Sequence, residues 1–539
     1  MKTRIFLSII MGTIALTACE NDVLDKGPLD VIDENIVWSD PQTAELYLND
    51  LYNSLTYYNI WDNLDNMSDL TEGGHSWLGC YTYNYGEVSA SNDPYGKWWY
   101  YRQIRRVNNL LDHSDMLTGE QDMIDRVLGQ AYFLRAYFYF YLVRSYGGVP
   151  LITHAQTLDE NLAVSRNTYE ECVEFIAEEM DRAANLLPLE WGGPNVGRPT
   201  KGAALAIKAR MLLYAASPLT NPGNDLSKWQ AAADAAKAVI DLGVYDLYPE
   251  YDKLFLDDNN VEVIFDVQWA YPYRVTSDPA ERVSCEFIIN PQGLNGAFGM
   301  NRPTQEYVDM FEMANGKPIT DPTSGYDPNN PYEGRDPRFY YSIFYNGVPW
   351  RDDTVETFIN GKHGPGIADL YETGSTMTGY YCRKFTDPST PCVYLVDEIQ
   401  ANWILIRYAE ILLNYAETQI ALGNEEEART YINIVRERVG MPPTDASGDA
   451  LVELYRNERA VELGMEEHRY FDIRRWKIAE DVLNGYVHKM TIEKNGDGTF
   501  SYAVEPMSPR SFPERMYWQP IPIDEIRKNP NLQQNPGYQ

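Results

Sequence analysis

The sequence predicts a mainly α-helical protein in which tetratricopeptide-like helix pairs support an irregular, loop-rich part with a few short strands. Long segments on both sides of residues 261–402 repeat apolar residues at helical spacing and occur in pairs. Several of them carry alanine at positions where small side chains let stacked helices approach closely. The interval 261–402 contains instead one strand-like run and many Asp-Pro and Asn-Pro turns.

The N-terminal half is expected to contain a series of helices. One begins at Pro41, because Asp40 provides a capping side chain ahead of a proline at the first helical position. Another ends at Gly147-Gly148-Val149-Pro150, a helix stop signal. Apolar periodicity predicts helices over residues 99–111, 131–146, 169–187, 201–216 and 228–242.

The C-terminal half is expected to contain two further helix pairs. Residues 405–422 and 425–439 form the first pair, joined at Gly423-Asn424, and residues 449–463 and 467–482 form the second. Between the two halves, residues 261–269 (VEVIFDVQW) are rich in β-branched and aromatic side chains, which predicts a strand. The rest of this interval is expected to be irregular.

The first nineteen residues, MKTRIFLSIIMGTIALTAC, predict a bacterial lipoprotein signal peptide. Lys2 and Arg4 precede an apolar run over residues 5–16 that is too short to span a bilayer. Residues 16–19 (LTAC) resemble a lipobox, in which Cys19 is acylated and becomes the N-terminus. An ordinary secretory signal with an incidental Cys is the alternative. We therefore expect residues 1–18 to be removed and Cys19 to carry acyl chains, which together hold a protein stably to a membrane.

Composition excludes several classes of protein. The chain has 79 Asp and Glu against 45 Lys and Arg, a formal net charge of −34, which repels nucleic acid and anionic lipid surfaces. Aromatic residues make up 13% of the chain, which excludes disorder. Tyrosine, at 41 residues, is the most frequent aromatic, and its apolar ring with a polar tip suits partly wet surfaces.

No catalytic or metal-binding motif stands out in the sequence. It has no nucleophile elbow, phosphate loop, HExxH or CxxC. We therefore expect that the protein is not an enzyme and has no cofactor, with a structural calcium on an Asp/Asn loop left open. Cys382 and Cys392 are close enough in sequence for a loop-closing disulfide after export, a pairing that the sequence cannot decide.

Characteristic segments occur from one end of the chain to the other: residues 24–28 (LDKGP), 131–152, 197–216, 334–338 (GRDPR), 405–417 (LIRYAEILLNYAE), 458–476 and 529–538 (NPNLQQNPGY). Together and in this order, these segments resemble the SusD/RagB family, outer-membrane nutrient-binding lipoproteins of Bacteroidota. The match departs from the family pattern at Gly334, where Asn is frequent, and at residues 465–468 (MEEH), where Phe-Glu-Gly is usual.

This resemblance implies a SusD-like fold of four tetratricopeptide-like helix pairs. It divides the mature chain into an N-terminal SusD-like region over residues 19–255 and a C-terminal RagB/SusD region over residues 256–539. It also implies a location on the extracellular face of the outer membrane and a partner, a SusC-like TonB-dependent barrel. The implied cargo is a neutral glycan, an oligosaccharide or polysaccharide that is passed to the barrel. Peptide cargo, as in RagB, and a tetratricopeptide-like scaffold without a nutrient are the alternatives.

The stretch over residues 57–101 is the main candidate for the ligand-binding region. It contains twelve Tyr and Trp and no Phe, and residues 62–97 lack helical periodicity, so we expect a loop there. Such rings can pack on the CH face of a pyranose while polar side chains bond its hydroxyls. By analogy with the family, the predicted ligand-binding residues here are Trp61, Asp69, Trp77, Tyr81, Tyr83 and Tyr85.

A second candidate cluster follows the predicted strand. Tyr271 and Tyr273 alternate along an extended segment and so face one way, and Arg274 follows them. In the family the loop after this strand approaches the ligand, whereas the alternative role is packing of the loop onto the scaffold. Trp350 is a further candidate.

Charged residues inside the family segments are expected to serve the scaffold. They recur at helical spacing, where ion pairs between stacked helices form. These residues are Arg135, Arg407, Glu410, Glu417, Arg459, Glu462 and Arg474.

Overall fold

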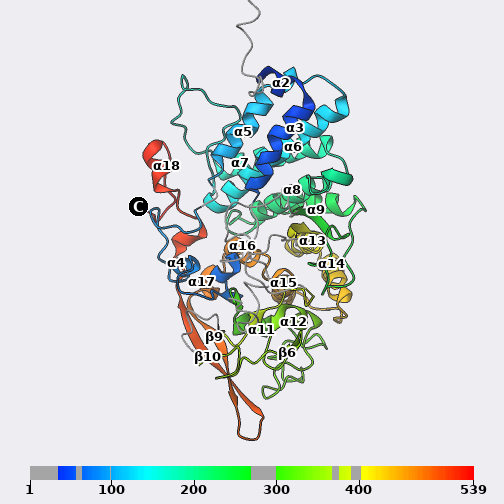
Figure 1. Cartoon of the computed structure of the whole chain (residues 1–539), viewed down its shortest axis with the longest axis vertical. Helices are drawn as coiled ribbons and strands as arrows, with labels where there is room; N and C mark the ends of the chain where they lie inside the picture. Colours follow the sequence, from blue (N-terminus) through cyan, green and yellow to red (C-terminus); the bar gives the residue numbers. More distant parts are fainter. Residues whose placement is uncertain are drawn as a thin grey trace, which may run out of the picture.

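The computed structural model describes residues 34–55, 63–96, 99–268, 299–366, 375–389 and 402–538. The predicted signal peptide and Cys19 lie outside these ranges, as do Trp61, Tyr271, Tyr273, Arg274 and Cys392. Figure 1 shows helices stacked over most of the length of the molecule, with an irregular part and a long hairpin at one end. The mainly α-helical fold class with a few short strands is confirmed.

The N-terminal helices begin at strong local capping signals. Asp40 accepts a hydrogen bond from the backbone N–H of Thr43 at 3.0 Å, and Thr168 forms a capping box with Glu171. The side chain of Thr200 caps the next helix by accepting a hydrogen bond from the backbone N–H of Ala203. The helices are α2 (Glu34–Ser39), α3 (Pro41–Asn49), α5 (Tyr101–Asp112), α6 (Gln121–Tyr146), α7 (Tyr169–Leu186), α8 (Lys201–Ala216) and α9 (Leu226–Ile240).

The C-terminal helices continue the same stack. The helices α13 (Tyr408–Ala421), α14 (Glu425–Arg438) and α15 (Asp449–Leu463) have bounds close to the predicted ones. Consecutive helices pack against each other in the pairs α6–α7, α8–α9 and α13–α14, and α9 packs against α13. This last contact joins the two halves of the chain into one helical body (Figure 1).

Two predicted helices are partly wrong. Residues 405–407 belong to the strand β8 (Trp403–Arg407), which pairs antiparallel with β2 (Val263–Val267). A short apolar run does not by itself distinguish a strand from a buried helix. Here the pairing with β2 makes residues 405–407 a strand. The predicted helix over residues 467–482 is broken into α16 (Arg469–Arg475) and α17 (Ala479–Val482), because Lys477 takes a left-handed conformation with φ 57°.

The irregular part holds several two-stranded sheets and short helices. The other described antiparallel pairs are β1 (Thr71–Glu72) with β3 (Arg302–Pro303), β4 (Ile343–Phe344) with β7 (Tyr381–Cys382), β5 (Pro349–Trp350) with β6 (Asp353–Thr354), and β9 (Gly485–Lys494) with β10 (Phe500–Arg510). The short helices are α4 (Cys80–Asn84), α11 (Gln305–Met310), α12 (Pro337–Ser342) and α18 (Ile523–Lys528). Single 3₁₀ turns cover Asp50–Ser54, Leu64–Met67, Ser114–Met116, Gly193–Asn195 and Glu514–Tyr517. Cys382, on β7, is a buried free thiol.

The hairpin of β9 and β10 is the main element that the sequence did not predict. It projects from the irregular part to one end of the molecule (Figure 1). Val487, Met490 and Ile492 are buried, which holds the base of the hairpin on the core. The dipeptide Asn495-Gly496 between the strands is a turn signal that could have located it.

A buried network of ion pairs attaches the irregular part to the helices. Arg338, on α12, contacts Asp336 at 2.7 Å, Glu458 at 2.5 Å and Glu462 at 3.1 Å. Glu458 and Glu462 lie on α15, so one guanidinium group joins two layers. Arg407 joins the same network from β8.

The predicted scaffold role of the charged family residues is confirmed for most of them. The structure contains the buried ion pairs Arg135–Glu179, Arg210–Glu410, Arg475–Glu417, Arg459–Asp472 and Arg407–Glu462. Arg474 differs, because its guanidinium lies over the rings of Tyr470 at 3.5 Å and Phe512 at 5.0 Å instead.

Candidate functional site

The aromatic-rich stretch is only partly a loop. After β1 it passes through Gly73-Gly74 into a turn over residues 75–78, closed by a hydrogen bond from the backbone N–H of Leu78 to the carbonyl oxygen of His75, and then forms the short helix α4. A Cβ atom on Gly74 would lie 2.7 Å from the carbonyl oxygen of Gly299, and one on Gly73 would lie 2.7 Å from Sγ of Cys80. Only glycine therefore allows this segment to pack against residues 299–303 and α4.

Trp77 presents the most exposed aromatic ring of this turn. Its side chain is 63% exposed, although Trp is an apolar residue. The ring stacks on the imidazole of His75, with centroids 5.6 Å apart and planes 26° from parallel. His75 is itself buried, so the exposed indole is supported from below by a fixed ring. His75 could not be identified from the sequence, since a single His between glycines and Ser carries no motif.

Tyr85 and Tyr81 lie one turn apart on α4 and its C-terminal cap. Their ring centroids are 5.7 Å apart, and Tyr85 is 43% exposed. The hydroxyl of Tyr81 donates a hydrogen bond to the carbonyl oxygen of Gly73 at 2.9 Å, which ties α4 to Gly73-Gly74. Burial raises the pKa of this hydroxyl above its ordinary value. We call Trp77, Tyr81 and Tyr85, with His75 beneath, the aromatic platform.

Tyr83 lies on the opposite side of α4 and is part of the core. Its hydroxyl donates to Oδ1 of Asp93 at 2.6 Å, and its ring packs edge-on against Tyr95 and Tyr470. Burial raises its pKa well above the ordinary value. Tyr83 is therefore not exposed, in contrast to the ligand-binding role that the sequence predicted for it.

Asp69 is also buried and already bound within the protein. Its two carboxylate oxygens accept hydrogen bonds from Nε and Nη2 of Arg469, at 2.8 and 2.7 Å. This bidentate pair joins the region before Gly73-Gly74 to α16. Both oxygens are engaged by Arg469, so Asp69 has a structural role within the protein and is not exposed to a ligand.

The remaining predicted ligand residues lie elsewhere. Trp61, Tyr271, Tyr273 and Arg274 fall outside the described residues. Trp350, on β5, is buried in a separate apolar cluster with Phe344 and Tyr381 and does not belong to the aromatic platform. Of the predicted residues, Trp77 and Tyr85 are exposed and Tyr81 packs against Tyr85, and the structure adds His75, on which Trp77 stacks.

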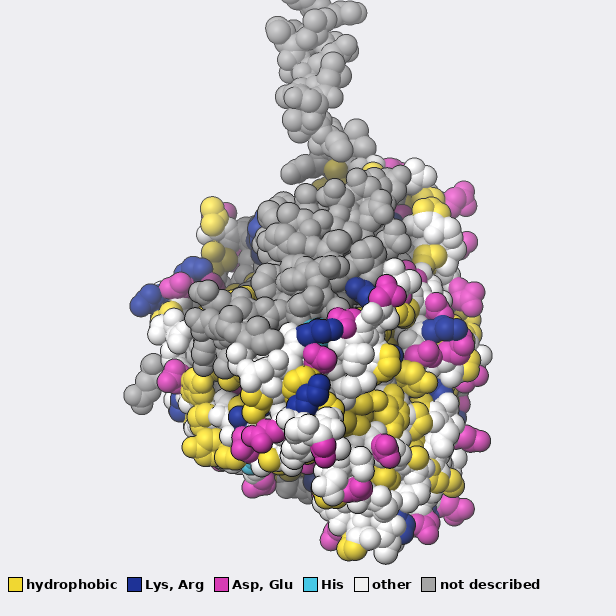
Figure 2. Space-filling view, turned by 60° about the horizontal axis from the view of Figure 1, so that its bottom comes forward, with side chains coloured by type: hydrophobic (Ala, Val, Ile, Leu, Met, Phe, Trp, Pro, Cys, Tyr) yellow, Lys and Arg dark blue, Asp and Glu magenta, His cyan; other side chains and the backbone are white. Residues whose placement is uncertain are grey.

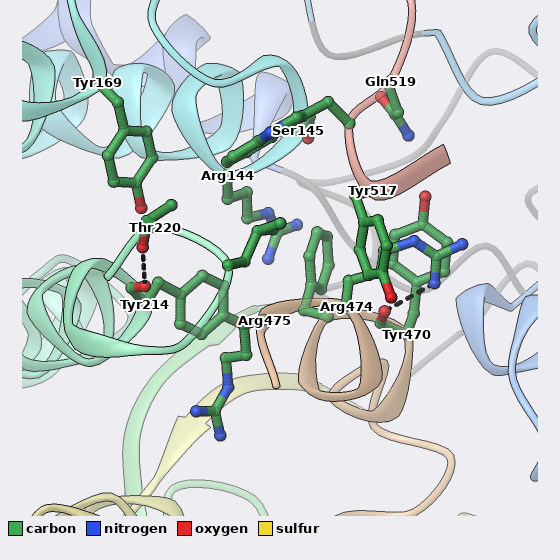
Figure 3. Close-up of a pocket in the computed structure, with 13 residues that line it drawn as sticks. Arg144, Ser145, Tyr169, Tyr214, Thr220, Tyr470, Arg474, Arg475, Tyr517 and Gln519 are labelled. Carbon is green, nitrogen blue, oxygen red and sulfur yellow. Dashed lines mark hydrogen bonds between the residues drawn. The ribbon is translucent and has the colours of Figure 1, made fainter. Parts of the chain in front are cut away.

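A small cavity lies between α6, α7, α8 and α16. Figure 3 shows side chains from α6, α7, α8, α16 and the C-terminal segment converging on it, among them Arg144, Tyr214 and Arg474. Its volume is about 20 Å³, which suits a water molecule, whereas ligand pockets span about 300–1,000 Å³. The cavity is therefore too small for a sugar ring.

The described ranges contain neither a metal-binding group nor a membrane-spanning helix. No three side chains of His, Cys, Asp or Glu gather there as a metal-binding group. None of the helices described here has the length and apolar character needed to cross a bilayer. Figure 2 shows acidic side chains spread over the described part of one face, interleaved with Lys and Arg.

The chain is similar to known proteins in both sequence and structure. A family model described as "SusD family" matches residues 261–538, and one described as "Starch-binding associating with outer membrane" matches residues 29–213. SusD-like protein P2 of Formosa agariphila is 24% identical, with 99% of each chain covered. A crystal structure of a SusD-like protein from Bacteroides fragilis is 32% identical with a TM-score of 0.80, covering 95% of this chain and 100% of that one. A SusD-like carbohydrate binding protein from the same species is 27% identical with a TM-score of 0.77, covering 92% and 100%.

Proposed function

The chain belongs to the SusD family, and on that premise we propose that it is a cell-surface lipoprotein that binds a neutral glycan and delivers it to a TonB-dependent outer-membrane transporter. Its role is binding without cleavage of the sugar. The aromatic platform is the proposed contact with the glycan.

The exposed ring of Trp77 is the observation that carries this proposal. A large apolar ring that is 63% exposed and stacked on a buried His75 is a rigid, solvent-facing surface. Such a surface is suited to the CH-rich face of a pyranose, which packs on an aromatic ring with little ordering cost. Tyr85, which is 43% exposed and packs against Tyr81, offers a second exposed ring in the same segment.

The family comparisons support carbohydrate as the class of cargo. One of the solved relatives, 27% identical over most of this chain, is described as a carbohydrate binding protein. The N-terminal family model carries a description that names starch binding and the outer membrane. The formal net charge of −34 disfavours an acidic polysaccharide and so favours a neutral one.

Anchoring and delivery complete the proposal. Cys19 would carry the acyl chains that hold the protein on the extracellular face of the outer membrane. The SusC-like barrel would receive the glycan from the lipoprotein above it. Co-purification of a TonB-dependent barrel with the tagged full-length protein, and loss of that association after Cys19→Ala, would test this part.

Replacement of Trp77 by Ala tests the binding site. We expect the Kd for the neutral oligosaccharide that the wild type binds to rise about thirtyfold, or about 2 kcal/mol, because the central stacking surface is removed. Isothermal titration with a panel of neutral oligosaccharides would measure it. The thermal midpoint should stay close to that of the wild type, since the ring is exposed.

Tyr486→Ala is the matched control, because Tyr486 is 60% exposed on the hairpin, outside the platform. It should bind like the wild type. Equal affinities for Trp77→Ala and the control would refute the platform as the binding surface. A blank glycan panel together with peptides that co-purify with the barrel would favour the peptide-binding alternative.

A further inference from the structure

A groove separate from the aromatic platform opens in the irregular part of the structure. It lies between residues 251–257, which follow α9, and residues 383–388, which follow β7, with Tyr341 of α12 and Trp350 of β5 also lining it. It shares no residue with the platform. Its volume of about 400 Å³ is within the range of about 300–1,000 Å³ that is typical of ligand pockets.

Aromatic rings form much of the groove wall. Phe255 and Phe385 pack edge to face with centroids 4.8 Å apart, which fixes one side. Trp350 is buried against Phe344, with centroids 4.7 Å apart. The ring of Tyr341 is 38% exposed and lies 6.2 Å from that of Tyr251, so it presents a supported surface to a ligand.

Arg383 provides unused hydrogen-bond donors in the same groove. Its guanidinium lies 5.4 Å from the ring of Trp350 and 5.7 Å from that of Phe344. Among the described residues its side chain makes no ion pair and no hydrogen bond, although an arginine can donate five. The indole N–H of Trp350 likewise has no partner within the described ranges.

The charges of the groove favour an uncharged ligand. The lining contains Asp252, Asp257 and Asp387 together with Lys253, Arg383 and Lys384. Two of these cations are already neutralised, since Glu250 binds Lys253 at 2.8 Å and Glu466 binds Lys384 at 2.7 Å. An anion would therefore meet more carboxylates than free cations, whereas hydroxyl groups can use both the donors and the acceptors.

We propose that this groove is a second glycan-binding subsite, which takes a short uncharged saccharide with Tyr341 as the stacking ring and Arg383 as the donor to its hydroxyls. This inference rests on the proposed function and adds a second point of contact to it. A polysaccharide held at both the groove and the platform would gain affinity by avidity, because the second contact is intramolecular.

The test compares the double variant Tyr341→Ala/Arg383→Gln with Trp77→Ala and with their combination. The mature protein is titrated with a neutral oligosaccharide that the wild type binds. Two binding events are expected in the wild type, one in the groove variant and one in Trp77→Ala. The combined variant should show none. Each single loss should weaken binding of the parent polysaccharide by about tenfold.

Tyr486→Ala/Arg527→Gln is the control, since both side chains are exposed away from the groove. Thermal unfolding of each variant checks the fold, and Tyr341→Ala alone gives the same readout if the Arg383 change lowers stability.

A folded groove variant that keeps two binding events overturns the proposal, as does a single event in the wild type that only Trp77→Ala removes. In both outcomes the proposed function stands, whereas a wild type that binds no saccharide contradicts the function itself. The proposal is also overturned if peptides bind in the groove and no saccharide does.

Discussion

Replacement of Arg407 by Met is expected to lower the free energy of unfolding by about 3–5 kcal/mol, the cost typical of breaking a buried ion pair by removing one partner. The guanidinium of Arg407 contacts Glu262 at 2.6 Å, Glu462 at 2.6 Å and Glu466 at 2.7 Å. All of these side chains are buried, so the substitution leaves carboxylates that water cannot solvate.

The position of Arg407 explains why its removal should have a large effect. It ends β8, which pairs with β2, while Glu462 belongs to α15. Burial by itself would raise the pKa of Glu462, but Arg438, Arg407 and Arg338 together hold that pKa well below its ordinary value. Loss of one arginine therefore weakens the contact between the small sheet and the helical stack.

Chemical denaturation at pH 7 would measure this change. Arg527→Met is the matched control, since Arg527 is exposed on α18 and pairs, within the described part of the chain, with the exposed Asp524 alone, a contact worth about 0–1 kcal/mol. Arg407→Lys should fall between the two, because one ammonium group cannot reproduce the fork of a guanidinium. Equal stabilities of Arg407→Met and the control would contradict the assigned role.

Replacement of Asp65 by Asn is expected to stabilise the protein by a few kcal/mol above pH 8 and to have little effect near pH 4. Burial, and next the carboxyl group of Glu467, raise the pKa of Asp65 to about 8 in the folded state. In the unfolded chain the pKa returns to about 3.9. Between these values the folded protein keeps a proton that the unfolded chain has lost.

The sign of the pH dependence follows from this difference. The contribution of Asp65 to stability is fully present below pH 4 and is lost as the pH rises through about 8. The pKa of Glu467 is also raised by burial, to about 7, and acts in the same direction. An amide at position 65 cannot ionise, so Asp65→Asn removes the larger part of the stability that the wild type loses as the pH rises.

Urea denaturation of both proteins between pH 4 and pH 9 would test the prediction. The stability of the wild type should fall relative to Asp65→Asn as the pH rises. Asp497→Asn, in the exposed turn of the hairpin, is the control and should show no alkaline stabilisation. Parallel pH profiles for Asp65→Asn and the wild type would show that Asp65 is ionised in the folded protein.

The helices of this protein could be predicted closely because their signals are local. The bounds of α8 and α15 agree with the periodicity of the sequence, and Thr200 caps α8. Elements that depend on partners distant in the sequence could not be predicted as well. The strand β8 shows this, since an apolar run adopts the extended form there by pairing with β2, more than a hundred residues away.

The same distinction applies to the candidate site. Composition alone located the aromatic-rich stretch, and Trp77 and Tyr85 prove to be exposed. Spacing did not show that Tyr83 points into the core, where it bonds Asp93. Neither did it show that Arg469 engages both oxygens of Asp69 from the far end of the chain.

The sequence by itself therefore determined the family, the helical fold class and the region where aromatic rings concentrate, because composition, periodicity and capping act within a few turns of chain. Only the tertiary structure decided which of those rings meet solvent. It also placed the supporting His75 and formed the groove around Tyr341 and Arg383. Burial and pairing depend on contacts between segments that are hundreds of residues apart, and no local pattern carries that information.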